Sequence, residues 1–351
     1  EAEAAFSDEI DRYLYSRFGN PTVTIFEKKL ALLEGAESCK ATSSGMAAVF
    51  AALASFLKSG DRLVASKALF GSCYFICKEI LPKYGVNICF VNGTSLDEWK
   101  EALSKPTKAI FLETPSNPNL EIIDIVSISK LAKKSKTKIF VDNVFSTPII
   151  QKPLELGADV VIYSATKHID GQGRCLGGAI LSSKEFIDDT ITPFIRHTGP
   201  ALSPFNAWIL LKGLETLNIR VQRHSENALK VAKHLANNKK VLKIIYPELP
   251  SHPQNKIAKR QMECGGGIVS FEIKGNKKDV FKFLNRLSLI KISNNLGDAK
   301  SLICHPATTT HQKLTEQEKS DIKITQNLLR LSVGLENIND LINDLDYALD
   351  S

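Results

Sequence analysis

A lysine and an aspartate that follow apolar segments are the residues of this sequence best placed to do chemistry. Lys167 comes just after an apolar segment and two hydroxyl residues, Ser164 and Thr166, and Asp142 ends a second apolar segment. Burying an unpaired charge is costly, so both charges need a reason to be there. A cofactor with an aldehyde, a pyridine nitrogen and a phosphate supplies a partner for all four residues. That combination indicates pyridoxal 5'-phosphate (PLP).

Each residue then has a predicted role in a PLP site. Lys167 is predicted to hold the aldehyde as a Schiff base and to act as general acid and base. Asp142 is predicted to face the pyridine nitrogen and favour its protonated form, which absorbs the electron pair left by a departing proton. We expect Ser164 and Thr166 to project to one side of an extended segment and reach the phosphate. The alternatives are a solvated lysine and an aspartate that caps a turn into Asn143.

Two further features complete the predicted site. Ser44, Gly45 and Met46 begin an apolar helix, where free N–H groups and the helix dipole attract a dianion. Arg330 lies inside an apolar strand, and its guanidinium fork matches a carboxylate, with a structural salt bridge as the alternative. The glycines around Gly171 do not form a dinucleotide motif, because their spacing is wrong and no strand-to-helix turn opens there.

Composition excludes several other classes of protein. The 351 residues include 45 basic and 38 acidic ones, for a net charge of +7, but no basic block is interleaved with aromatics, so we expect no nucleic-acid partner. The longest nearly apolar run, residues 46–57, is too short to span a bilayer, so we expect no membrane. Seven cysteines, an odd number, favour free thiols in a reducing cytoplasm. Cys73 and Cys77 share a helical face, but without a second pair we expect packing and no metal.

Short β-branched segments alternate with helical ones along most of the chain, which predicts an α/β protein with a mainly parallel sheet between helices. The predicted strands are Arg62–Ala65, Asn87–Val91, Ala109–Glu113, Ile139–Asp142, Val160–Ser164 and Gly178–Leu181, the last of them antiparallel because no crossover helix precedes it. The predicted helices include one that ends at Gly35, then Met46–Leu57, Leu69–Tyr84, Ser95–Leu103 and Asp124–Ser135.

A long helical region, Phe205–Asn237, is predicted to lead into a smaller α+β unit. That unit has strands near Ile268–Glu272 and Leu329–Val333 and a closing helix near Ile338–Leu349. We therefore divide the chain into an N-terminal arm (residues 1–20), a large PLP-binding domain (21–222) and a small C-terminal domain (223–351), with the boundary near Arg223.

With these pieces located, the chain from about Tyr15 onward resembles the Cys/Met-metabolism branch of the fold-type I PLP enzymes. The motifs that carry the resemblance are Tyr15-Ser-Arg-Phe-Gly-Asn-Pro21, Ser43-Ser-Gly-Met46, Glu113-Thr-Pro-Ser-Asn-Pro118, Val141-Asp-Asn143 and Ser164-Ala-Thr-Lys167. The branch usually carries a further N-terminal segment that clasps a neighbouring subunit. We therefore expect this sequence to be truncated at its start, with a weakened tetramer as the alternative.

The resemblance implies further site residues and an assembly. Phe70 takes the place of the aromatic that stacks on the cofactor ring, and Asn117 lies beside the phenolic oxygen. Tyr15 and Arg17 would cross to the phosphate of a neighbouring subunit, which implies active dimers within a homotetramer. Arg330, with Asn295, would bind the substrate α-carboxylate.

Two stretches, Asp170–Gly178 and Arg196–Asn206, look most like the O-succinylhomoserine sulfhydrylases of the branch. Asn294 stands where cystathionine enzymes often carry a glutamate, and an amide there favours a small anionic sulfur donor. The resemblance therefore implies conversion of O-succinylhomoserine and sulfide to homocysteine and succinate, with Arg174 facing the succinyl carboxylate or making a loop salt bridge. The alternatives are a cystathionine γ-synthase, a γ-lyase, an O-acetylhomoserine sulfhydrylase and a non-catalytic PLP-binding paralogue.

Overall fold

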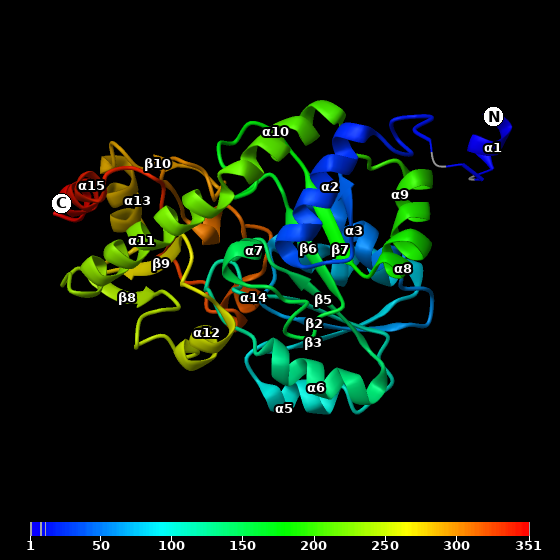
Figure 1. Cartoon of the computed structure of the whole chain (residues 1–351). Coiled ribbons are helices and arrows are strands. Elements are labelled where there is room, and N and C mark those ends of the chain that lie inside the picture. The colour runs from blue at the N-terminus through cyan, green and yellow to red at the C-terminus, as the bar shows by residue number, and fades with distance from the viewer. Residues whose placement is uncertain (1, 8, 11, 351) are drawn as a thin grey trace.

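Two β-sheets organise the chain. The computed structural model describes residues 2–7, 9–10 and 12–350. A seven-stranded sheet belongs to the first part of the chain and a five-stranded sheet to the second. They lie side by side in Figure 1, with the smaller sheet on the left. The helices α10 (Pro204–Glu215) and α11 (Leu217–Ala236) connect the two parts.

The larger sheet is mainly parallel, as predicted. Its strands are β1 (Ser38–Thr42), β2 (Arg62–Ser66), β3 (Asn87–Val91), β4 (Ala109–Glu113), β5 (Lys138–Asp142), β6 (Val160–Ser164) and β7 (Gly178–Ser182), in the order β1-β7-β6-β5-β4-β2-β3. The strands from β3 to β6 run parallel. Strand β7 is antiparallel to both β6 and β1, which confirms the predicted reversal. Strand β1 is an addition that the sequence analysis did not predict.

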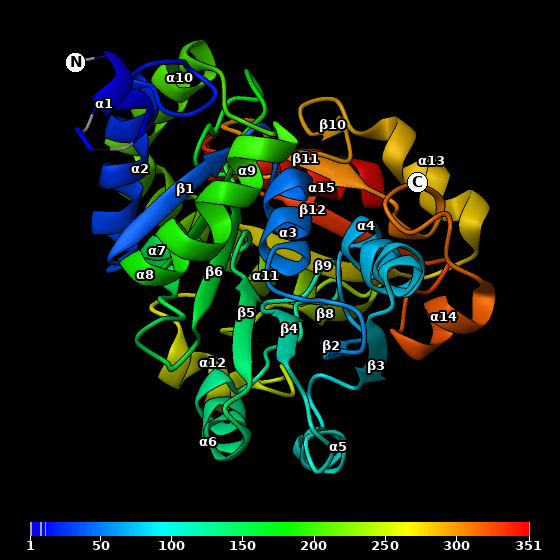
Figure 2. The same cartoon turned by 90° about the vertical axis from the view of Figure 1, so that its right-hand side faces the viewer.

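Helices cover both faces of this sheet (Figure 2). Because successive strand residues point to opposite faces, β6 places Val160 and Ile162 in one core and Val161 and Tyr163 in the other. The first core is covered by α3 (Gly45–Ala54) and α9 (Thr192–Thr198), and the opposite face by α2 (Pro21–Glu34), α5 (Leu96–Ala102), α6 (Ile125–Ser135) and α10. Burial on both faces explains why these strands read as continuous apolar runs.

Three predicted helices differ from the structure. The predicted helix Leu69–Tyr84 is instead a short α4 (Gly71–Phe75), a π-helical turn (Ile76–Ile80) and a 3-10 turn (Leu81–Tyr84). Pro82, which has no N–H to donate, lies in that last turn and prevents a regular helix. The predicted helical region 205–237 is two helices, because the N–H of Thr216 bonds back to Gly213 in a tighter turn. The helix predicted over 46–57 ends at Ala54, where the capping N–H of Ser55 closes the last turn.

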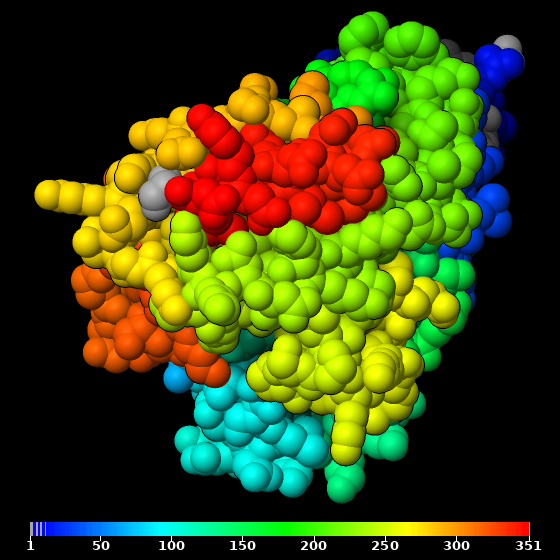
Figure 3. All heavy atoms as spheres, turned by 90° about the vertical axis from the view of Figure 1, so that its left-hand side faces the viewer, coloured from blue at the N-terminus to red at the C-terminus, as the bar shows by residue number. Residues whose placement is uncertain are grey.

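The smaller sheet is mainly antiparallel. Its strands are β8 (Val241–Ile245), β9 (Ile268–Ile273), β10 (Lys291–Ile292), β11 (Leu302–Cys304) and β12 (Leu328–Ser332), in the order β10-β11-β12-β9-β8. Helix α11 packs on it through an apolar stripe of Ala228, Val231, Ala232 and Leu235. Helix α13 (Lys277–Arg286) and helix α15 (Ile338–Leu349) complete the layer, and Figure 3 shows α15 beside α11 on the outer face.

The strands predicted near residues 270 and 330 and the closing helix are confirmed, whereas β8, β10 and β11 were not predicted. The domain limits stay a prediction, and Arg223 lies inside α11. The remaining helices are α1 (Ala2–Phe6), α7 (Thr147–Ile150), α8 (Lys184–Phe186), α12 (Asn255–Gln261) and α14 (Glu316–Asp321), with a π-helical turn at Ile187–Ile191 and a 3-10 turn at Pro306–Thr308. Within the described ranges, no helix has the length and apolar character that crossing a membrane requires.

Candidate active site

A cleft of about 1180 Å³ opens at the carboxyl ends of the parallel strands, where ligands of open α/β sheets usually bind. Both parts of the chain line it. It contains nearly all of the predicted site residues: Ser44, Gly45, Met46, Phe70, Asn117, Asp142, Ser164, Thr166, Lys167, Arg174, Asn295 and Arg330. The tertiary structure therefore brings together residues that are spread over almost 290 positions of the sequence.

Lys167 extends from a turn just beyond β6. Its backbone N–H donates to the carbonyl of Ser164 at 3.2 Å, so the segment that we expected to be extended is in fact a turn. The Nζ atom donates to Oδ1 of Asn295 at 2.8 Å. Burial, together with the charge of Arg330, lowers the pKa of Lys167 to about 8. The amine is therefore close to the free-base form that a nucleophile or general base needs.

The start of α3 and the end of β6 form a cradle. Ser44 caps α3, because its Oγ accepts a hydrogen bond from the N–H of Ala47 at 3.1 Å. A Cβ on Gly45 would lie 2.5 Å from the Cβ of Ser164, so only glycine allows this approach. Thr166 exchanges hydrogen bonds with the backbone of Gly177, at 3.2 and 3.1 Å, and still lines the cleft. A helix N-terminus beside hydroxyl groups fits a phosphate dianion.

Two buried carboxyl groups form the floor of the cleft. Asp142 ends β5 and is the cross-strand neighbour of Glu113, which ends β4. Burial raises the pKa of Asp142 to about 7, and burial together with the charge of Asp142 raises the pKa of Glu113. Oδ1 of Asp142 accepts from the N–H of Val144 at 3.2 Å, so this residue also caps a turn, as the alternative interpretation held. A protonated ring nitrogen would stabilise the carboxylate form of Asp142.

Glu113 is a residue that the sequence analysis quoted in a motif without assigning it a role. Its Oε2 accepts from the N–H of Phe70 at 2.6 Å, and its Oε1 accepts from the N–H of Asn117 at 3.1 Å. One carboxyl group thus holds the backbone of two predicted cofactor contacts. The sequence did carry a signal for this residue, because Glu113 ends an apolar strand, as Asp142 does.

Arg330 enters the cleft from β12 of the smaller sheet. Its side chain is buried, Nη1 donates to Oδ1 of Asn117 at 3.0 Å, and Nη2 donates to the carbonyl of Asn294 at 2.9 Å. Among the described residues it forms no salt bridge, and its Nε has no hydrogen-bond partner. The structural salt bridge is therefore not the explanation for Arg330. A buried, unpartnered donor on a cation fits a ligand carboxylate.

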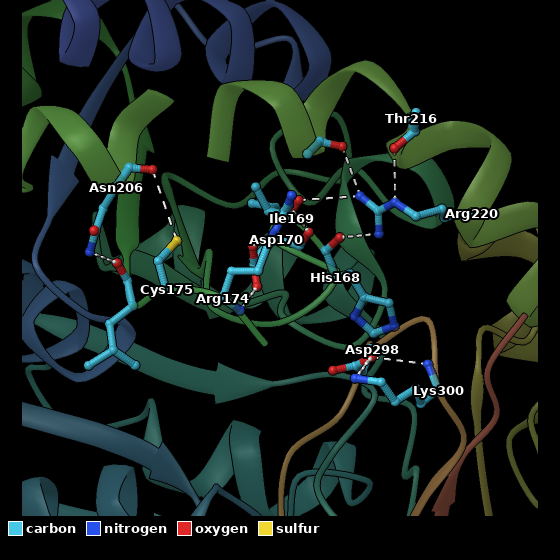
Figure 4. Close-up of polar contacts among 12 residues, drawn as sticks. His168, Ile169, Asp170, Arg174, Cys175, Asn206, Thr216, Arg220, Asp298 and Lys300 are labelled. Atoms are coloured by element: carbon cyan, nitrogen blue, oxygen red, sulfur yellow. Dashed lines mark hydrogen bonds and ion pairs between the residues drawn. The ribbon is translucent and has the colours of Figure 1, made fainter. Parts of the chain in front are cut away.

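Arg174 makes the loop salt bridge that we kept as its alternative role. Its N–H, Nε and Nη2 donate to Asp170 at 2.7, 2.9 and 2.8 Å (Figure 4). The side chain still lines the cleft. A second role toward a substrate carboxylate stays a prediction.

Tyr15 and Arg17 are the two predicted site residues that lie outside this cleft. Tyr15 is exposed, and Arg17 bonds the carbonyl of Arg196 and lies over the ring of Phe18, with 4.8 Å between Cζ and the ring centroid. The N-terminal segment is found beside α2, away from the smaller sheet (Figure 1).

His311 is a cleft residue that the sequence analysis missed. It is buried, its Nδ1 is 2.8 Å from Oγ1 of Thr310, and its Nε2 has no partner among the described residues. Burial and the charge of Arg330 lower its pKa to about 4, which keeps the ring neutral. Its position depends on a loop of the smaller unit, so the sequence carried no signal for it. The described residues contain no cluster of His, Cys, Asp and Glu that could hold a metal ion.

Comparisons with known proteins agree with this geometry. The model of the family described as "Cys/Met metabolism PLP-dependent enzyme" matches residues 1–350. The chain is 53% identical to an O-succinylhomoserine sulfhydrylase of Mycobacterium tuberculosis, over 99% of this chain and 87% of that protein. It is 43% identical to an L-methionine gamma-lyase of Fusobacterium nucleatum, over 98% of this chain and 88% of that protein.

A solved structure of a putative O-acetylhomoserine (thiol)-lyase from Campylobacter jejuni is also similar. It superimposes with a TM-score of 0.96 at 35% identity, over 100% of this chain and 91% of that one. That structure carries a pyridoxyl-lysine phosphate.

Proposed function

This chain belongs to the Cys/Met metabolism family of PLP-dependent enzymes, and we propose that it converts O-succinylhomoserine and sulfide to homocysteine and succinate. The observation that carries the proposal is the meeting of Lys167, Asp142 and Arg330 in one cleft. The similarity to the mycobacterial sulfhydrylase supports the succinyl ester as substrate. Asn294 lines the cleft and supports a small anionic sulfur donor, because its amide offers no carboxylate to an incoming ammonium group.

The residues present fit PLP. The Gly45 and Ser164 cradle suits its phosphate, the amine of Lys167 suits its aldehyde, and the carboxyl group of Asp142 suits its ring nitrogen. When bound, the cofactor supplies a ring that stabilises negative charge at substrate carbons. Phe70 and Asn117, both held by Glu113, are proposed to contact its ring and its phenolic oxygen.

The chain's own residues then handle binding and proton transfer. Arg330 is proposed to bind the α-carboxylate of the substrate, with Asn295 beside it. Lys167, oriented by Asn295, removes the Cα proton and then a Cβ proton, so that succinate leaves from Cγ. Sulfide then bonds to Cγ as HS⁻, and Lys167 returns one proton to Cβ and one to Cα. The net change replaces one C–O bond by one C–S bond.

We also propose that the active unit is a dimer within a homotetramer. Tyr15 and Arg17 lie outside their own cleft, as a contribution to a neighbouring subunit requires. Large apolar side chains are exposed on the N-terminal segment and on the adjoining helices α2 and α10: Tyr13, Tyr15, Ile25, Leu32, Phe205 and Trp208. Such a surface favours association. We place the enzyme in methionine biosynthesis in the cytoplasm, where its seven free thiols stay reduced.

A product assay tests the reaction. Purified protein with added PLP receives O-succinylhomoserine, first with sulfide and then with cysteine. Homocysteine as the main product supports the proposal, whereas cystathionine would identify a γ-synthase. Release of 2-oxobutanoate would identify a γ-lyase, the second candidate favoured by the 43% identity to the L-methionine gamma-lyase. Absence of any product despite bound PLP would support a non-catalytic paralogue.

The role of Arg174 has its own test. If its guanidinium meets the succinyl carboxylate, Arg174→Ala raises KM for the succinyl ester far more than KM for the acetyl ester. Equal effects on both esters would leave Arg174 with its salt bridge to Asp170 alone.

A further inference from the structure

The turn that follows Lys167 is held by a buried arginine from a different element (Figure 4). Arg220 lies in the first turn of α11. Its Nη1 donates to the carbonyl of His168 at 2.7 Å, and its Nη2 donates to the carbonyls of Ile169 at 3.3 Å and Gly213 at 2.8 Å. Its Nε donates to Oγ1 of Thr216 at 3.1 Å. One guanidinium therefore satisfies the carbonyls of the two residues that directly follow Lys167.

This arrangement has an energetic cost that its local contacts do not explain. Arg220 is only 6% exposed, and within the described part of the chain no acidic side chain forms an ion pair with it. Burial, followed by the charge of Arg174, lowers its pKa. The charge of Asp170 acts in the opposite direction, but a buried cation whose hydrogen bonds go only to carbonyl and hydroxyl oxygens is still expensive. The cost is reasonable if the precise position of the turn matters.

The surrounding backbone is shaped to admit the guanidinium. Gly171 has φ +71°, and a Cβ there would lie 2.1 Å from Nη1 of Arg220. A Cβ on Gly213 would lie 2.1 Å from the carbonyl oxygen of Ile169. Both glycines therefore let α10, α11 and the turn approach one another more closely than any side chain would permit.

The same turn also sets the partner of the lysine amine. The N–H of Gly171 donates to the carbonyl of Lys167, and the carbonyl of Gly171 accepts from the N–H of Ala299, both at 2.8 Å. Ala299 lies in the loop between β10 and β11, which also carries Asn295, whose Oδ1 accepts from Nζ of Lys167. The backbone of the lysine and the loop of its hydrogen-bond partner are thus joined through one turn.

We propose that Arg220 is a positioning residue for Lys167, a proposal that rests on the function proposed above for that lysine. Arg220 fixes the turn by its fork of hydrogen bonds, and the turn aligns Nζ of Lys167 with Asn295 and with the reacting carbons. Lysine at position 220 keeps the charge but replaces the planar fork by a single point of donation. The geometry of the fork, rather than its charge, is therefore what the function needs.

The test compares Arg220→Lys with Arg223→Lys in the 351-residue chain. Arg223 is a matched control, because it lies three residues further along α11, is only half-buried, and pairs with Glu226 at 3.8 Å. PLP is added to each cofactor-free protein, and the rate at which the Lys167–cofactor linkage forms is followed by its visible absorbance. We expect R220K to slow this rate and to lower kcat by about 10- to 100-fold, with KM changed less than threefold. R223K should match the parent protein.

Two further measurements keep the proposal falsifiable. Thr216→Val removes only the acceptor of Nε, so it should fold even if R220K does not, and it should slow the linkage by about two- to threefold. The proposal would be overturned if R220K had the linkage rate and kcat of the parent protein, even with a lower Tm. If R220K does not fold, the same result for T216V would overturn it. Reduction with borohydride and mass spectrometry of the parent protein show whether Lys167 holds the cofactor. If it does not, the proposed function itself fails.

Discussion

The buried charged groups on the two walls of the cleft differ in their hydrogen-bond partners and in their pKa values. On the wall that carries Lys167, each buried ionic group has oxygen or nitrogen partners: Arg220 meets three carbonyls and a hydroxyl, and Asp170 binds Arg174 three times. The second, acidic wall consists of the floor residues Asp142 and Glu113, at the ends of β5 and β4, and of Arg330 from β12. Here Asp142 and Glu113 are neighbours with raised pKa values, and Nε of Arg330 has no partner among the described residues.

This difference separates scaffold from binding surface. A network in which each charge has hydrogen-bond partners holds its shape without a ligand, whereas buried carboxyl groups with raised pKa values and a buried donor without a partner gain most when a ligand of complementary charge arrives. The lysine wall therefore sets geometry, and the acidic wall with Arg330 provides the interaction energy. Substitutions of four residues on the acidic wall test this contrast.

The largest effect is expected from Asp142→Asn. Without the carboxylate at the ring nitrogen, kcat/KM should fall by about 10²- to 10³-fold, because a charge-assisted hydrogen bond to the reacting system is lost. The activity assay with saturating PLP measures this loss. A loss of less than threefold would contradict the assigned role.

The same substitution should stabilise the cofactor-free protein. Burial raises the pKa of Asp142 to about 7, so the folded state holds a proton more tightly than the unfolded state does. Stability of the parent then falls as pH rises from about 4 to about 7, whereas an asparagine does not titrate. Urea unfolding should find D142N more stable by about 1–3 kcal/mol at pH 8 and near the parent at pH 4.

Arg330→Met should weaken substrate binding and raise the pKa of Lys167. Loss of the guanidinium should raise KM for the amino-acid substrate by about 10- to 100-fold. It also removes a positive charge that helps lower the pKa of Lys167 to about 8, so that pKa should rise. The pH dependence of chemical labelling of Lys167 in the cofactor-free protein measures the shift. An unchanged or lower midpoint would show that Arg330 does not act on the amine.

Glu113→Gln should have an intermediate effect. An amide has one acceptor oxygen, so one of the two N–H groups, on Phe70 or on Asn117, loses its partner at a cost of about 1–3 kcal/mol. We expect a similar loss of stability in urea and a fall in kcat of about tenfold. Glu121→Gln is the control, because that half-buried acid lies outside the cleft. Equal effects of the two variants would place Glu113 among ordinary buried acids.

The smallest effect is expected from Cys73→Ser. The thiol of Cys73 is 4.0 Å from Oδ2 of Asp142, so a hydroxyl in its place can donate to the carboxyl group. Cys77 is buried in the same core, and its thiol makes no hydrogen bond among the described residues. Cys77→Ser should therefore cost about 1–3 kcal/mol of unfolding free energy, and C73S less than 1 kcal/mol. Thermal unfolding of the two variants tests this order.

Local patterns in the sequence predicted the elements that are proposed to hold the cofactor. Apolar runs that end in Asp142 and Ser164 predicted buried parallel strands, because strands covered on both faces read as continuous hydrophobic segments. The serine and glycine before the apolar helix predicted the cradle at the start of α3 for an equally local reason. Those predictions needed only neighbours in the chain.

Contacts between distant segments were decided by the tertiary structure alone. Arg220 follows Lys167 by more than fifty positions, and only the packing of α11 brings its guanidinium to the turn. The partners of Arg330 and the burial of His311 likewise depend on where the smaller sheet docks. Pro82 and Thr216 changed helices that periodicity alone predicts as continuous. The amino-acid sequence was therefore enough to identify the groups proposed to do the chemistry, but not how they are held, because hydrogen bonding and burial depend on neighbours in space.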